Sequence, residues 1–184
     1  MIISFTGFMG SGKTTIARKV SELFRSPHID LDTCIEGSER RSIAEIFRED
    51  GEEAFRAMEE SCLQRIIRGH TEISKPPSLL FLSLGGGSVI SAENRGLIKK
   101  HTRCIYLKAS IDTIIHRVGE AAFSRPLVSG LDQRELRSKV EKLYLERAPL
   151  YEDCASLTIE TDYLSQDEIV KLISETTLSD VLSS

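Results

Sequence analysis

GFMGSGKT, residues 7–14, decides the fold, because it fits the phosphate-loop pattern G-x-x-x-x-G-K-[ST] at every specified position. Glycines in such a loop adopt dihedral angles that turn several backbone N–H groups toward one point, where they bind phosphate. In this pattern Lys13 reaches the β- and γ-phosphates and the Thr14 hydroxyl ligates Mg²⁺. The apolar run MIISF precedes the loop and an amphipathic helical pattern follows it, which favours a phosphate site over an ordinary turn with a solvated lysine.

Length and composition bound the class of protein. The chain has 184 residues, of which 40% are hydrophobic, so we expect a single domain over residues 1–184. No run is long enough to span a membrane, and a phosphate loop starting at Gly7 leaves no room for a signal peptide, so we expect a cytoplasmic protein. The net charge of −4 and the lack of a basic tail argue against a nucleic-acid partner.

Two further expectations follow from composition and pattern. The four cysteines are widely spaced with no C-x-x-C, so we expect reduced thiols, mostly buried, rather than disulfides or a zinc site. No extended apolar face is left over once the helical patterns are assigned to a sheet, so we expect a monomer.

The rest of the chain alternates short apolar runs with helical patterns, which is typical of a parallel sheet covered by crossover helices. We therefore predict a three-layer α/β/α fold, with LLFLSL in the middle of the sheet because it lacks polar alternation. Helix starts are predicted at the capping boxes Ser42–Glu45 and Ser165–Glu168 and at Ser110. The predicted strands are residues 1–6, 27–31, 79–84, 103–109 and 156–161.

Two segments exceed this minimal alternation: an insertion over about residues 31–61 and another over about residues 119–133. Ligands of open α/β sheets sit at the carboxyl ends of the strands, where such insertions can cover them. We interpret the first segment as an acceptor-binding insertion and the second as a lid.

The first insertion opens with HIDLD, and strand alternation would place Asp30 and Asp32 on one face, opposite the phosphate loop. One carboxylate can organise Mg²⁺ and its waters, and the other can accept the proton of an attacking hydroxyl. Solvated turn residues are the alternative, because Asp is common where strands end.

Arg56 and Glu59 lie three apart in GEEAFRAMEES, a spacing that can hold a guanidinium still while its donors face a ligand carboxylate. An ordinary surface ion pair fits the spacing as well.

The third predicted strand ends in Gly85, Gly86 and Gly87, which suit either close approach of the backbone to a ligand or a tight turn. No Asp or Glu closes this strand as a usual Walker B sequence would, so we assign the metal to Thr14, Asp30 and waters. Ser83 is a candidate to contact these metal-binding groups without binding the metal itself.

Three further arginines are candidates for the site; the alternative for Arg125 and Arg147 is a solvated side chain, and for Arg117 a place at a helix C-terminus without a ligand. Arg125 lies in the predicted lid, where it can bring a cation over the transferring phosphoryl group. Arg117 follows a helical pattern and can contact the base or phosphates. Arg147 precedes Pro149, which we expect to end its helix and to fix Arg147 at the mouth of the site.

Taken together, these motifs resemble the shikimate kinases, P-loop kinases of the nucleoside-monophosphate-kinase type. The resemblance covers about residues 1–161 and rests on the order and spacing of GFMGSGKT, HIDLD, SIAEIF, GEEAFRAMEE, GGG, RPL and RAPLY. It implies a five-stranded parallel sheet in the order 2-3-1-4-5. It also implies phosphorylation of the 3-hydroxyl of shikimate by MgATP, on the pathway to chorismate and the aromatic amino acids.

The resemblance also implies roles for individual residues. Shikimate would contact Asp32, Arg56, Arg147 and the glycines at 85–87, and Glu59 would steady Arg56. Catalysis would rest on Lys13, Asp32 and Arg125, and Mg²⁺ on Thr14 and Asp30. ATP would be bound by Gly10, Ser11, Gly12, Lys13, Thr14, Thr15, Arg117 and Arg125.

One feature departs from the family pattern: the predicted lid reads EAAFSRPLV, with an apolar Phe123 where family lids are often more polar. Two alternatives stay open from the residues alone. One is another small-metabolite kinase, acting on gluconate or a nucleoside monophosphate; the other is a nucleotide-dependent binding protein that has lost transfer.

Overall fold

The computed structural model describes residues 1–73, 79–120 and 133–177. Five parallel strands form one sheet in the order β2-β3-β1-β4-β5, which confirms the predicted strands, their order and the inner position of LLFLSL. The strands are β1 (Ile2–Thr6), β2 (His28–Asp30), β3 (Leu80–Ser83), β4 (Thr102–Lys108) and β5 (Leu157–Glu160).

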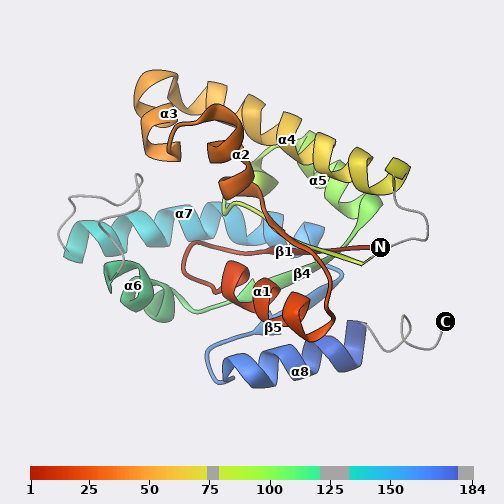
Figure 1. Ribbon diagram of the computed structural model, residues 1–184. Helices are drawn as coiled ribbons and strands as arrows, with labels where there is room; N and C mark the ends of the chain where they lie inside the picture. The colour runs from red at the N-terminus through yellow and green to blue at the C-terminus, as the bar shows by residue number, and fades with distance from the viewer. Residues whose placement is uncertain (74–78, 121–132, 178–184) are drawn as a thin grey trace.

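Helices cover both faces of this sheet, so the predicted three layers are confirmed. Figure 1 shows α1 and α8 on one side of the strands and α4, α5 and α7 on the other. The helices are α1 (Lys13–Leu23), α2 (Leu31–Glu39), α3 (Ile43–Glu49), α4 (Gly51–Ile73), α5 (Ala92–His101), α6 (Ile111–Glu120), α7 (Gln133–Cys154) and α8 (Gln166–Thr177), with a short 3₁₀ helix, η1 (Ser88–Ile90).

Strand β1 shows why the layers form. Its alternate residues Ile3 and Phe5 belong to the apolar cluster shared with α1 and α8, whereas Ile2 packs into the cluster on the opposite face. Every residue of β1 is buried, as expected for the central strand of a sheet covered on both sides. The phosphate loop therefore follows a fully buried strand.

The predicted helix starts are confirmed by their hydrogen bonds. Ser42 and Glu45 form a complete capping box at α3, and Ser165 and Glu168 bond reciprocally before α8. The Ser110 hydroxyl accepts from the Thr113 N–H at the start of α6.

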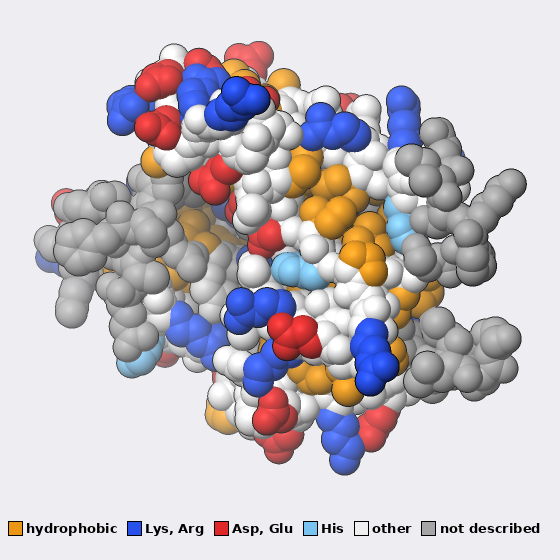
Figure 2. Space-filling view, viewed as in Figure 1, with side chains coloured by type: hydrophobic (Ala, Val, Ile, Leu, Met, Phe, Trp, Pro, Cys, Tyr) orange, Lys and Arg blue, Asp and Glu red, His pale blue; other side chains and the backbone are white. Residues whose placement is uncertain are grey.

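The predicted acceptor-binding insertion folds as α2, α3 and the first half of α4, and α2 and α3 both pack on α4. Figure 2 shows positive and negative side chains intermixed over α3, where Arg41 pairs with Glu49 and Asp50. The four cysteines are free thiols, three of them buried, as predicted. Two of them meet in space, with 3.3 Å between the sulfurs of Cys34 and Cys62.

Across the described ranges 1–73, 79–120 and 133–177, the structure contains no helix of the length and apolarity needed to cross a bilayer.

Candidate active site

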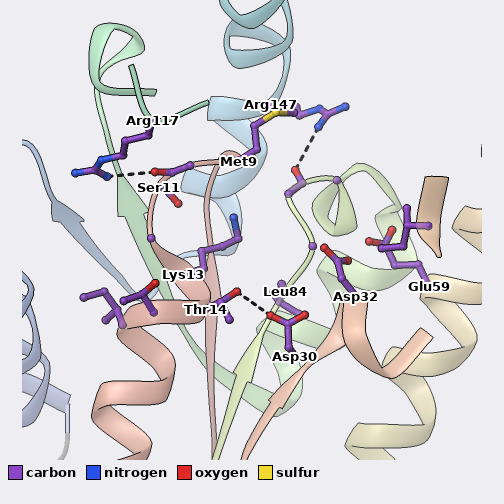
Figure 3. A pocket seen from close by; sticks show the side chains of 18 of the residues that line it. Met9, Ser11, Lys13, Thr14, Asp30, Asp32, Glu59, Leu84, Arg117 and Arg147 are labelled. Atoms are coloured by element: carbon purple, nitrogen blue, oxygen red, sulfur yellow. Dashed lines mark hydrogen bonds between the residues drawn. The ribbon is translucent and has the colours of Figure 1, made fainter. Parts of the chain in front are cut away.

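A cavity of about 740 Å³ opens at the carboxyl ends of the strands. It is lined by the phosphate loop, by α2 and α4 of the insertion, by the glycine turn after β3, and by residues from α6, α7 and the β5–α8 connection. This is the edge where ligands of parallel α/β sheets bind. Figure 3 shows the polar side chains of these elements pointing toward a common space.

The phosphate loop has the backbone that its sequence predicts. Gly7, Gly10 and Gly12 have φ angles of 142°, 80° and 96°, a region that side-chain-bearing residues rarely adopt. A Cβ at Gly7 would lie 2.6 Å from the carbonyl oxygen of Leu107, so this glycine is also required for close packing on β4. Ser11 and Thr15 line the same cavity, and the buried Ser11 hydroxyl has no hydrogen-bond partner among the described residues.

Lys13 crosses back over the loop at the N-terminus of α1. Its Nζ donates to the carbonyls of Gly7 and Phe8, each at 2.9 Å, which holds the ammonium beside the loop N–H groups. The positive end of the α1 dipole lies at the same place. Amine, amides and helix dipole together form an anion site.

Thr14 and Asp30 face one another beside the loop, as Figure 3 shows. The Thr14 hydroxyl donates to the Asp30 carboxylate at 2.7 Å, and both residues line the cavity. Hydroxyl and carboxylate oxygens are ligands that Mg²⁺ accepts together with waters and phosphate oxygens. Ser83 does not join this pair, because its hydroxyl lies 2.9 Å from Nε2 of His28.

The prediction that strand alternation places Asp30 and Asp32 on one face is wrong. Strand β2 ends at Asp30, which caps α2 by accepting from the Thr33 N–H at 3.2 Å, and Asp32 belongs to the first turn of the helix. The two carboxylates nevertheless reach the same cavity, because helix α2 starts at its rim. Leu31 between them is fully buried and fixes this turn on the core.

Asp32 lies in an environment that opposes its negative charge. Burial raises the pKa of this carboxyl from 3.8 to about 6, with smaller contributions from the charges of Asp30 and Glu59, while Lys13 acts in the opposite direction. A carboxylate with a pKa near neutrality can accept a proton at physiological pH.

Arg56 and Glu59 form a buried pair and not an ordinary surface ion pair. Glu59 is 1% exposed, accepts from Arg56 Nη1 at 2.8 Å and accepts from the buried Ser88 hydroxyl at 2.6 Å. Burial lowers the pKa of Arg56, but the charge and hydrogen bond of Glu59 outweigh it and the pKa is raised. Glu52 holds Nη2 from the solvent side at 3.0 Å, so the guanidinium is fixed at the cavity wall.

Two of the three glycines after β3, Gly85 and Gly87, are explained by close approach of side chains. A Cβ at Gly85 would lie 2.7 Å from Asp32 Oδ1 and 2.8 Å from a Glu59 oxygen, and a Cβ at Gly87 would lie 2.5 Å from the Arg56 nitrogens. None of the three has a positive φ angle. Gly85 and Gly87 therefore lack side chains because the site's carboxylates and guanidinium occupy that space, whereas Gly86 faces the backbone of the phosphate loop.

Arg147 reaches the cavity from α7 and is only 6% exposed. The expectation that Pro149 ends this helix is wrong, because α7 continues through it to Cys154. Proline removes the hydrogen bond to the carbonyl of Leu145, an exposed residue whose carbonyl can bond to water. The last turn is retained because Tyr151 and Cys154 are buried in the core.

The nucleotide end of the cavity includes one predicted residue, Arg117, and four residues that the sequence analysis missed. Arg117 on α6 donates to the Gly10 carbonyl at 3.2 Å, so it lies against the phosphate loop. Four residues of the β5–α8 connection and of α8 line the cavity: Thr161, Leu164, Gln166 and Ile169. Their position in the sequence could have indicated them, because they follow a strand whose carboxyl end faces the site.

Arg125 and residues 121–132 of the predicted lid lie outside the described residues, so the lid prediction stays a prediction. Ile43, Phe47 and Phe55 also line the cavity; they lie within SIAEIF and GEEAFRAMEE, but the sequence analysis assigned them no role.

A phosphate loop, a 2-3-1-4-5 parallel sheet and an adjoining pocket of fixed arginines and a carboxylate define a P-loop kinase. The family model described as shikimate kinase matches residues 9–177. The chain belongs to the shikimate kinase family.

Individual relatives agree with this assignment over nearly their whole length. The shikimate kinase of Rhodococcus jostii is 40% identical over 88% of this chain and 89% of its own. That of Dictyoglomus turgidum is 37% identical over 91% of each chain. Among solved structures, shikimate kinase from Acinetobacter baumannii in complex with shikimate has a TM-score of 0.85 and 30% identity, covering 98% of this chain and 94% of that one.

Proposed function

We propose that this enzyme transfers the γ-phosphoryl group of ATP to the 3-hydroxyl of shikimate, giving shikimate 3-phosphate and ADP. The observation that carries the proposal is the convergence of Arg56, Arg147 and Asp32 on one glycine turn beside the phosphate loop. Two guanidinium forks suit the carboxylate of a small ring acid, and one carboxylate suits its hydroxyl groups.

On the acceptor side, Arg56 and Arg147 bind the shikimate carboxylate. Glu59 keeps Arg56 in place from behind, because it is itself held by Ser88. Asp32 accepts a hydrogen bond from the attacking hydroxyl, and its raised pKa lets it take up the proton during transfer. The glycine backbone at 85–87 permits the ring to approach closely.

On the donor side, the N–H groups of residues 10–15 bind the ATP phosphates, and Lys13 balances charge on the transferred group. Arg117 lies where the nucleotide leaves the loop and faces the base, with Leu164 and Ile169 also lining this end. Arg125 is proposed as the lid cation over the phosphoryl group.

The residues present fit Mg²⁺. Thr14 and Asp30 supply one hydroxyl and one carboxylate, which are hard oxygen donors. Mg²⁺, when bound, would neutralise negative charge that develops on the phosphate oxygens. The remaining ligands would come from ATP and water.

A coupled ADP-release assay with MgATP tests the proposed function. Shikimate is run beside gluconate, AMP and no acceptor. Turnover with shikimate alone is expected, because only a carboxylate on a compact hydroxylated ring satisfies both arginines and Asp32 together. Preference for gluconate or AMP, or nucleotide binding without turnover, would contradict the acceptor assignment.

The expected monomeric state and cytoplasmic location stay predictions. Light scattering after gel filtration tests the first, and fractionation of cells tests the second.

A further inference from the structure

The turn between β3 and η1 makes a contact that the proposed reaction does not use. Tyr151 on α7 is fully buried, and its hydroxyl donates to the carbonyl oxygen of Gly86 in a very short hydrogen bond. Burial raises the pKa of Tyr151, so this hydroxyl stays protonated and remains a donor at working pH. A core tyrosine thus reaches one peptide group of the candidate active site.

The same carbonyl is also within reach of Arg147, which stands one helical turn before Tyr151 on α7. Arg147 Nη1 lies 3.5 Å from the Gly86 oxygen, at the limit of a hydrogen bond, and Figure 3 shows this contact as a dashed line. Both donors reach the same carbonyl oxygen, and the tyrosine holds the shorter bond. The carbonyl is therefore already satisfied by Tyr151, and the contact with Arg147 stays at the limit of hydrogen bonding. Arg147 also acts on the Tyr151 hydroxyl itself: burial raises the pKa of this hydroxyl, and Arg147 lowers it in part.

Gly86 also lies against the donor side of the site. A Cβ at Gly86 would lie 3.4 Å from the backbone nitrogen of Met9 in the phosphate loop. The N–H groups of Gly86 and Gly87 donate to no acceptor among the described residues. Since the peptide between them is planar, fixing the Gly86 carbonyl also fixes the direction of the Gly87 N–H.

We infer that Tyr151 is a positioning residue: by occupying the Gly86 carbonyl, it keeps the guanidinium of Arg147 available for the carboxylate of the acceptor. The inference rests on the proposed function and adds a residue to it. Without the hydroxyl, the buried carbonyl would lose its short bond, and the Arg147 guanidinium, already 3.5 Å away, would be drawn closer to satisfy it. A guanidinium drawn to the protein backbone binds its ligand less well.

Tyr151→Phe removes the hydroxyl and keeps the ring. Tyr106→Phe is the matched control, because the rings of Tyr106 and Tyr151 lie 5.2 Å apart in the same cluster. The Tyr106 hydroxyl is buried beside Tyr144 without a partner at hydrogen-bonding distance and angle. Both variants lose one buried oxygen, but only one loses the bond to the glycine turn.

Tyr151→Phe should raise the shikimate KM roughly three- to tenfold, the size expected for the loss of one neutral hydrogen bond. Its ATP KM and its kcat should stay within about twofold of wild type. Tyr106→Phe should leave the shikimate KM unchanged. An unchanged shikimate KM in Tyr151→Phe, or equal changes for both substrates, would overturn the inference.

A double-mutant cycle tests whether Tyr151 acts through Arg147. In an Arg147→Ala background, Tyr151→Phe should change kcat/KM for shikimate by less than about twofold, because the guanidinium that the carbonyl would draw away is gone. A full, additive loss there would contradict the mechanism. If wild type itself did not phosphorylate shikimate, the proposed function would fail and the inference with it, whereas an active wild type with an unaffected Tyr151→Phe rejects the inference alone.

A measurement on the wild-type protein covers the case in which Tyr151→Phe does not fold. In proton NMR, the Tyr151 hydroxyl should give a slowly exchanging signal with a cross-peak to the Gly87 N–H or the Gly86 Cα protons. Rapid exchange of this hydroxyl with water would overturn the inference.

Discussion

Replacing Asp32 by Asn should stabilise the protein while impairing its activity. Burial of this carboxyl near Asp30 and Glu59 makes its ionised form unfavourable in the folded state, which is why its pKa rises from 3.8 to about 6. Asn keeps the shape and removes the charge. The structure therefore predicts opposite effects of one substitution on stability and on turnover.

The size of the stability change follows from the linkage between proton binding and folding. Each pKa unit is worth about 1.36 kcal/mol, so this rise corresponds to roughly 3 kcal/mol lost by the folded wild type at pH 8. For an acid whose pKa is raised on folding, the loss is absent below the unfolded pKa, grows with pH, and is complete above the folded pKa. About half of it remains at pH 5.

Thermal unfolding followed by circular dichroism measures the effect. Asp32→Asn should raise Tm by roughly 6–12 °C at pH 8 and by about half as much at pH 5, relative to wild type. Glu22→Gln, which changes an exposed carboxylate on α1, is the control and should shift stability by less than about 0.5 kcal/mol. A Tm at pH 8 that is unchanged or lower in Asp32→Asn would refute the reasoning.

Four further predictions concern catalysis and binding. Arg56→Ala should raise the shikimate KM roughly 10- to 150-fold by removing a charge-assisted fork, with ATP affinity within about twofold; equal losses for both ligands in titration calorimetry would contradict this. Gly85→Ala should lower kcat/KM for shikimate at least about tenfold, since its Cβ would lie 2.7 Å from Asp32. The control Gly37→Ala on α2, with open space around it, should stabilise the fold by about 0.5–1 kcal/mol. Similar behaviour of both variants in kinetics and melting would count against the close-approach argument. The pH profile of kcat/KM for shikimate should fall below about pH 6 as Asp32 becomes protonated, and a flat profile down to pH 5 would remove it as the proton acceptor. Arg125→Ala should lower kcat far more than either binding constant, and an unchanged kcat would exclude this residue as the lid cation.

The parts of the fold that were predictable are those coded by local sequence. The phosphate loop needs positive φ angles that only glycine adopts readily, and the capping boxes at Ser42 and Ser165 are local hydrogen-bond patterns. The strand runs were recognisable because a sheet covered on both faces requires continuous apolar segments.

The errors arose where tertiary context decides. HIDLD alternates like a strand, yet Asp30 caps a helix by accepting from the Thr33 N–H, and a buried Leu31 fits both arrangements. Pro149 has the sequence signature of a helix end, but the buried residues after it keep α7 intact. Spacing alone gives no burial, so it could not distinguish the 1% exposed Glu59 from a surface partner of Arg56.

The bond between Tyr151 and Gly86 was equally invisible in the sequence, since it joins residues 65 apart that carry no joint motif. Contacts of this kind depend on how α7 packs against the sheet, which periodicity does not specify.

Identification of the phosphorylated product tests the central claim most directly. Wild-type protein is incubated with MgATP and shikimate, and the product is examined by phosphorus and proton NMR. The account predicts one ADP per shikimate and a phosphate on the 3-hydroxyl alone. Phosphate on another hydroxyl, or only inorganic phosphate and unchanged shikimate, would contradict the placement of the acceptor by Asp32, Arg56 and Arg147.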